Sequence, residues 1–330
     1  MKLDIHNHTI SQNLTTKKIR EIVLEILHLH SLDAIAITNL HSIQDALRLY
    51  EQCPGQIIIG AEYKVGGEEA SSFQTVVLGI NPGLHELLMQ SRHRGISYFT
   101  GMLKEKKLPY YLSHIGLGIP KDHANAAKLL EDALSLFDAI DVLDAVSLQK
   151  NSFALGLARY YGMATIGGSG SLIMQGQKRG YTQADGEYNI HEFFHSFLLK
   201  KVDVGTTSAS SESKVLPSIW QISQEFYQKE IKRIWQSEIG ISTQTTTGHL
   251  LQNAAQVLLS PALDTTQQIF HLHHTKSLEK KMSSFQSCFI DYLKNKETKR
   301  IFSLPVGVEK KKKLWLESLS RIHESFQNSG

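Results

Sequence analysis

The chain has 330 residues, of which 41% are apolar and 20% charged, and this composition excludes a disordered or low-complexity protein. Its net charge is +3: residues 1–203 carry 19 Lys and Arg against 21 Asp and Glu, and residues 204–330 carry 16 against 11. This modest basic excess fits a solvated surface and does not by itself indicate a nucleic-acid partner. The N-terminus lacks an apolar leader pattern and no apolar run is long enough to span a membrane, so we expect a cytoplasmic protein.

Short β-rich runs alternate with helical patterns over the first 200 residues. Helices are expected at 15–30, 42–52 and 152–162, between the strands. This alternation is typical of βα units around a parallel sheet, and seven strands with their helices favour a closed or nearly closed barrel. The predicted strands are at about 2–8, 34–38, 56–62, 74–80, 109–114, 139–146 and 164–168.

A change of composition follows the last predicted barrel helix. Residues 204–216 are rich in Ser and Thr and poor in apolar residues, and Pro217 opens a new helical pattern. We therefore predict a barrel domain at 1–205, a linker at 206–216 and an all-helical domain at 217–330. The helical domain is the expected contact for a protein partner.

The stretch LDIHNHT (3–9) places metal-competent side chains at every second position. On a strand, residues i, i+2 and i+4 share a face, so Asp4, His6 and His8 are expected to point together. One carboxylate and two imidazoles on a buried face are costly unless they are paired or bind a ligand. The stretch therefore suggests a metal ion or a hydrogen-bond network.

Further motifs follow this stretch in a recognisable order: LDAIAITNLHSI, IIIGAEY, PYYLSHIG, FDAIDVLDAVS and MATIGGSGS. Over about residues 1–200 the sequence resembles the polymerase and histidinol phosphatase (PHP) superfamily of metallophosphoesterases. The resemblance implies a distorted (βα)7 TIM-like barrel with up to three Zn, Mn or Fe ions at the strand ends, which activate water for phosphoester hydrolysis. His6 and His8 match the opening ligand pair of that family, Glu62 its bridging carboxylate, and His114 a further histidine.

The sequence also departs from the family pattern. Asn39-Leu40 stands where the family has Asp-His, and Gly170 and Leu172 stand where it has a second Asp and His. Ligand counting then leaves one divalent ion, Zn or Mn, held by His6, His8 and Glu62. His41 would need a bulged loop to replace the ligand missing at Leu40.

In this one-metal interpretation the expected catalytic side chains are His114, as base or extra ligand, and Asp4. The substrate would be a phosphorylated small molecule or a nucleic acid. The alternative is a barrel that binds no metal and kept its fold without its chemistry. Such a pseudoenzyme would act as a non-catalytic scaffold, with the barrel and the basic helical domain binding a protein or a nucleic acid.

Three further features have both a functional and a structural interpretation. Residues Gly168, Ser169, Gly170 and Ser171 could cradle a phosphate on backbone N–H groups, or form only a small-residue turn. HEFFH (191–195) matches the zinc-protease motif HExxH, with Glu212 or Glu225 as candidate third ligand, but its phenylalanines suit a barrel helix. Asp141 is expected to be a polar structural residue at the barrel mouth.

Overall fold

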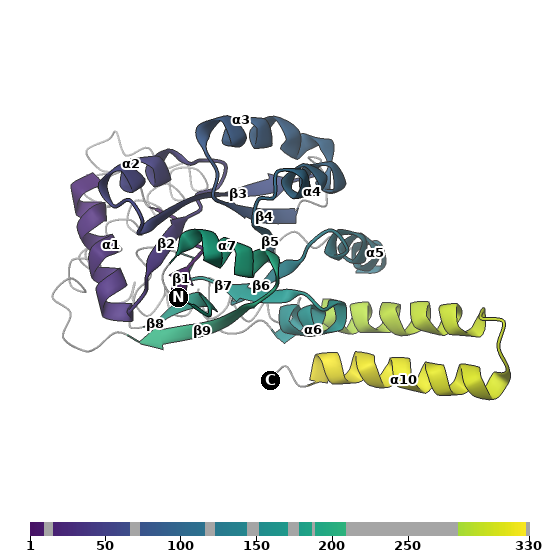
Figure 1. Ribbon diagram of the computed structural model, residues 1–330. Helices are drawn as coiled ribbons and strands as arrows, with labels where there is room; N and C mark the ends of the chain where they lie inside the picture. The colour runs from purple at the N-terminus through teal and green to yellow at the C-terminus, as the bar shows by residue number, and fades with distance from the viewer. Residues whose placement is uncertain are drawn as a thin grey trace, which may run out of the picture. The chain divides into compact units, whose positions relative to one another are not determined.

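The computed structural model describes residues 1–9, 16–66, 73–115, 123–143, 152–170, 178–186, 189–208 and 283–327. Nine strands form one mixed sheet, and helices surround it (Figure 1). The strands are β1 (Lys2–Asp4), β2 (Ala34–Ile37), β3 (Ile57–Val65), β4 (Phe73–Leu78), β5 (Tyr110–Ser113), β6 (Ala139–Leu143), β7 (Ala164–Gly167), β8 (Lys178–Ala184) and β9 (Val202–Ser208). The helices are α1 (Thr16–His30), α2 (Gln44–Gln52), α3 (Pro82–Ser91), the 3-10 turn η1 (Arg92–Arg94), α4 (Ile96–Glu105), α5 (His123–Leu134), α6 (Ser152–Tyr161), α7 (Ile190–Leu198), a helix over 283–302 and α10 (Val308–Gln327).

The strands follow the order β7-β6-β5-β4-β3-β2-β1-β8-β9. β1, β2 and β3 are parallel neighbours, as are β5, β6 and β7, whereas β4 lies antiparallel between β3 and β5. The Thr182 hydroxyl of β8 accepts from the Gly167 amide of β7 at 3.0 Å and donates to the Gly167 carbonyl at 2.9 Å. These contacts bring the two ends of the sheet together, so the sheet is a nearly closed barrel.

Two of our predictions about the sheet were wrong. We predicted seven strands in a parallel sheet, but the sheet has nine strands, and β4, β8 and β9 pair antiparallel. The first strand also ends at Asp4 and does not continue to residue 8. β8, KRGYTQA, escaped prediction because an inward arginine and a glycine break the apolar alternation that marks a half-buried strand.

The barrel interior is filled from several strands and from one helix. Phe193 and Phe197 of α7 pack against interior residues of the strands such as Leu3, Val76 and Ile166. The Asn189 side chain accepts from the first amides of α7, at 2.9 Å from His191 N, and so caps this helix. The interior is therefore a packed core, and polar side chains collect at one end of the strands.

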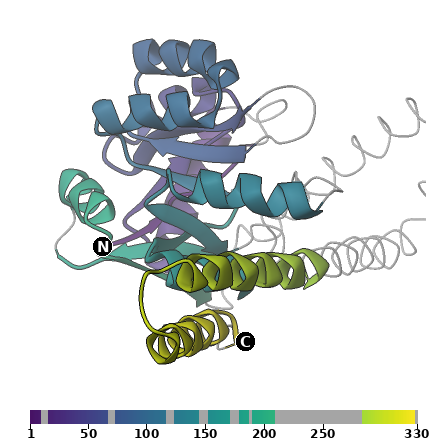
Figure 2. The same ribbon diagram turned by 90° about the vertical axis from the view of Figure 1, so that its right-hand side faces the viewer.

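Two helices at the end of the chain pack on the barrel. Figures 1 and 2 show helix 283–302 and α10 running side by side. The Phe153 ring of α6 contacts Phe285, Phe289 and Phe326, at centroid distances of 5.7, 5.8 and 6.2 Å. A Cβ on Gly156 would lie 2.3 Å from the Phe326 ring, so this glycine allows α6 and α10 to approach closely.

The predicted domain boundaries of 206–216 and 217 remain predictions. β9 includes residues 206–208, and 209–216 lie outside the described residues. By its internal contacts the chain divides into one compact unit of Met1–Ser213 with Met282–Gly330 and a second unit of Lys214–Lys281. Most of the predicted helical domain, including the whole second unit, lies outside the described residues. Among those described, no helix has the length and apolarity to cross a membrane.

Candidate metal centre

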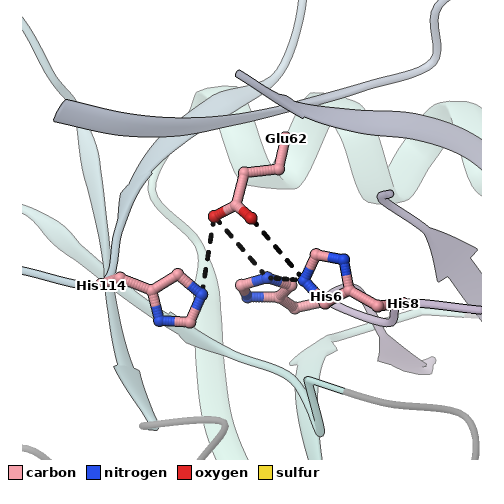
Figure 3. Close-up of side chains that lie close together, drawn as sticks. All are labelled: His6, His8, Glu62 and His114. Carbon is pink, nitrogen blue, oxygen red and sulfur yellow. Dashed lines mark hydrogen bonds and ion pairs between the residues drawn. The ribbon is translucent and has the colours of Figure 1, made fainter. Parts of the chain in front are cut away.

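Four side chains converge at one end of the barrel: His6, His8, Glu62 and His114 (Figure 3). One donor atom from each lies within 4.8 Å of all the others. The Nε2 atoms of His6 and His8 are 3.2 Å apart. The Glu62 carboxylate lies 4.0 Å from His6 Nε2, 3.6 Å from His8 Nε2 and 3.5 Å from His114 Nε2. Within the described residues this is the one such group.

The topology explains why these residues meet. The carboxyl ends of parallel barrel strands lie at the same end of a barrel, where loops gather functional side chains. His6 and His8 follow β1, Glu62 lies toward the end of β3, and His114 follows β5. His114 has a positive φ of 48°, a conformation that non-glycine residues adopt rarely and mostly where the surroundings require it.

The donor spacing fits a single ion. For bonds of 2.0–2.1 Å in a tetrahedral site, neighbouring ligand atoms should be about 3.3 Å apart. Four of the separations are 3.2 to 4.0 Å, near this value, and all pairs lie within 4.8 Å, so small movements of the side chains would bring the four donors around one ion. Three imidazoles with one carboxylate suit Zn²⁺, and also Mn²⁺ or Fe²⁺ when water completes the coordination.

Asp141 of β6 fixes the orientation of the His6 ring. Its Oδ2 lies 3.2 Å from His6 Nδ1, and its Oδ1 accepts from Leu143 N at 3.0 Å. A carboxylate accepts only, so Nδ1 of His6 carries a proton and Nε2 is the nitrogen that faces the cluster. Burial acts to lower the pKa of His6, but the hydrogen bond to Asp141 and the charge of Glu62 together raise it.

His8 and Glu62 also have the charge state and the restraint that binding of a cation requires. Burial, followed by the neighbouring His6, lowers the pKa of His8 to about 4, so this ring is neutral and able to coordinate at pH 7. The Ser113 hydroxyl donates to Glu62 Oε1 at 2.8 Å and restrains the carboxylate. The His8 side chain is 32% exposed while that of His6 is fully buried, so solvent reaches the cluster from the His8 side.

Asp4 is not part of this cluster, contrary to the shared face that we expected for Asp4, His6 and His8. Its Oδ2 pairs with Arg179 Nη1 at 3.0 Å, and its Oδ1 accepts from Ser169 N at 2.8 Å. Arg179 also donates to Asn7 Oδ1 at 3.0 Å. Asp4 therefore holds β8 and the loop after β7 against the first strand, and both of its oxygens are engaged.

The glycine-rich loop packs against His6 and Asp4, and two of its amides are bound to them. The Ser169 amide is bound to Asp4, and Gly170 N donates to His6 O at 2.6 Å. A Cβ on Gly168 would lie 2.5 Å from His6 N, which shows how closely this loop approaches. Two of the amides proposed for a phosphate cradle are thus occupied, and Ser171 lies outside the described residues.

The second motif supplies no ligand. Asn39 Nδ2 donates to Thr9 Oγ1 at 2.6 Å and to Asp45 Oδ2 at 3.0 Å, while Leu40 is 49% exposed. The His41 ring accepts from Lys64 N at 2.9 Å and stacks on Tyr63. His41 therefore does not replace the ligand missing at Leu40.

Comparisons with known proteins give several matching structures, two of which are weakly similar to this chain as follows. No family model matches the sequence, and no curated protein matches it. PsfC from Pseudomonas syringae is 18% identical, with a TM-score of 0.46, over 69% of this chain and 98% of its own. A proposed metal-dependent phosphoesterase from Bifidobacterium adolescentis is 13% identical, with a TM-score of 0.34, over 52% of this chain and 87% of its own.

The HExxH segment lies on α7, away from the four-residue cluster. His191 and His195 are exposed, while Phe193 and Phe197 of the same helix are buried in the barrel. Neither histidine belongs to a group of metal donors within the described residues. The candidate third ligands, Glu212 and Glu225, lie outside those residues.

Sequence reasoning missed two residues that support the site, Ser113 and Arg179, and gave a third, Asp141, only a structural role. Asp141 had a signal, since it is an acidic residue inside a strand that is otherwise apolar. Ser113 directly precedes His114, but only the structure shows that its hydroxyl reaches Glu62. Arg179 gave no signal in the sequence, because it lies on β8, a strand that we did not predict.

Proposed function

We propose that this barrel holds one divalent cation, Zn²⁺ or Mn²⁺, on His6, His8, Glu62 and His114 and hydrolyses phosphoesters with it. The observation that supports the proposal is the convergence of four donor atoms within 4.8 Å, with Asp141 and Ser113 orienting two of them. His114 is then a fourth ligand, and the cation has room for water on the exposed His8 side. Our prediction of a three-ligand site is thereby extended by one residue.

The choice of phosphoester chemistry rests on the sequence resemblance to the PHP superfamily. Its matched residues follow β1 and β5 or lie in the second half of β3, and they meet at the same end of one barrel. A bound cation would stabilise charge on phosphoryl oxygens and lower the pKa of a coordinated water. The chain itself supplies restrained side chains in a largely buried site, where electrostatic interactions are stronger than in bulk water.

Metal content and activity test this proposal together. After loading with Mn²⁺ or Zn²⁺ and desalting, the wild-type protein should retain about one ion per chain. The His6→Ala/His8→Ala variant should retain none. Hydrolysis of p-nitrophenyl phosphate should require the loaded wild-type protein, because only there are ion and ligands combined.

The exposed histidines of α7 provide a matched control. A His191→Ala/His195→Ala variant removes the same number of imidazoles and should keep both the ion and the activity. Loss of the ion in this control instead would favour the HExxH alternative. A wild-type protein that takes up no ion and hydrolyses nothing would contradict our proposal and favour the non-catalytic scaffold.

Ser113→Ala should weaken metal binding without unfolding the protein. The variant removes the hydroxyl that restrains Glu62, and loss of such a supporting contact typically lowers metal affinity by about tenfold to a hundredfold. Titration calorimetry with Zn²⁺ measures the change. The control is Ser135→Ala, whose hydroxyl binds only the Asp132 carbonyl on α5, and its metal affinity should equal that of wild type.

A further inference from the structure

Three polar residues, Lys64, Gln74 and Ser113, form a row across neighbouring strands beside the four-residue cluster. The row lies one residue pair nearer the barrel mouth than Glu62. Lys64 is two residues beyond Glu62 on β3, so both side chains are on the same face of the sheet. The strand register pairs Lys64 with Gln74 of β4, and Gln74 with Ser113 of β5. The Ser113 hydroxyl reaches Glu62, which shows that this face is the one that carries the cluster.

Gln74 has an unsatisfied polar atom in this row. Its side-chain oxygen is buried and has no hydrogen-bond partner among the described residues. Buried amide groups are normally paired, and an exception calls for a ligand or water. Directly paired residues on one face have Cβ atoms about 5 Å apart, so Gln74 is a near neighbour of both Lys64 and Ser113.

Lys64 contributes a cation whose main chain is held in place. Its amide donates to His41 Nε2 at 2.9 Å, and its carbonyl accepts from Arg92 Nη1 at 3.5 Å. The side chain is exposed, and none of the ion pairs between described residues includes it. The ammonium group is therefore available to an anion at the mouth.

We propose that Lys64 and Gln74 form the subsite for the phosphoryl oxygens that face away from the cation, and that the substrate is a phosphomonoester. This inference rests on the function proposed above. A divalent ion beside Glu62 leaves one net positive charge, and Lys64 supplies the second that a phosphate dianion requires. The Gln74 amide, whose oxygen and nitrogen exchange places when the group turns by 180°, donates an N–H to a phosphate oxygen.

Binding of inorganic phosphate to the metal-loaded protein tests the subsite. Calorimetry should show that Lys64→Met and Gln74→Leu each weaken phosphate binding about tenfold or more, while Zn²⁺ affinity is unchanged. Lys64→Arg should restore binding to within about threefold, because the charge is kept. Lys104→Met removes an exposed lysine of α4 and should bind phosphate as wild type does.

Kinetics separate this role from a merely structural one. Lys64→Met should raise KM for p-nitrophenyl phosphate about tenfold and change KM for bis(p-nitrophenyl) phosphate much less, because the diester carries a single charge. Unchanged phosphate affinity in both variants, or a wild-type protein that binds metal but no phosphate, would overturn the subsite and leave the metal centre intact. A wild-type protein that binds no metal would instead overturn the proposed function itself.

Discussion

Replacing Arg179 by leucine should lower the free energy of unfolding by about 3–5 kcal/mol. The guanidinium and its partner Asp4 are almost completely buried, with side-chain exposures of 2% and 0%. Arg179→Leu leaves the Asp4 carboxylate in the barrel interior without its cation, and an uncompensated buried charge is among the most destabilising changes known. It also removes the donor to Asn7 Oδ1.

Urea denaturation measures this effect, and two further variants define its cause. The double variant Asp4→Asn/Arg179→Leu removes the unpaired charge of the Asp4 carboxylate and should recover a large part of the lost stability. Lys200→Met breaks an exposed pair with Asp138, in which the side chains are 40% and 53% exposed, and should cost less than about 1 kcal/mol. An Arg179→Leu variant within about 1 kcal/mol of wild type would contradict the structural role assigned to this pair.

The sequence predicts most of the barrel because most of its strands are apolar and alternate with helices. Each of the seven predicted strands has a counterpart, but β8 and β9 were missed. Both owe their strand conformation to tertiary pairing: β8 lies between β1 and β9, and its inward arginine finds its partner on β1. The sequence of β9, VDVGTTS, has a Gly and two Thr in its second half, and by itself this composition predicts the start of a linker.

The meeting of the four cluster residues could be predicted from the sequence, and the residues that support them could not. His6, His8 and His114 follow strands β1 and β5 and Glu62 lies within β3, which run in the same direction, so their convergence depends mainly on the strand order. The position of Asp4 depends instead on where β1 stops and on a partner 175 residues away along the chain. Such long-range pairs leave no periodic signal in one sequence, and the same holds for the contact of Ser113 with Glu62.

Gly168→Ala should damage the metal centre although residue 168 offers no ligand. An alanine Cβ would lie 2.5 Å from His6 N, 2.6 Å from His6 Cβ and 2.9 Å from Asp4 Oδ1. The first contact is with main chain, which cannot rotate away, so the strand end that carries His6 must shift. We expect a loss of about 1–3 kcal/mol in the free energy of unfolding.

The shift of His6 should also weaken Zn²⁺ binding by about tenfold to a hundredfold, as the loss of an orienting contact does. Calorimetry and urea denaturation on the same preparation measure both effects. Gly101→Ala is the matched control: apart from its own helix, no atom of the part of the chain that the structure describes lies within 4 Å of its Cβ position on α4. The variant should gain up to about 1 kcal/mol and keep its metal affinity. If Gly168→Ala matched wild type in both measurements, the close packing of this loop on His6 would not be needed to hold the ligand in place.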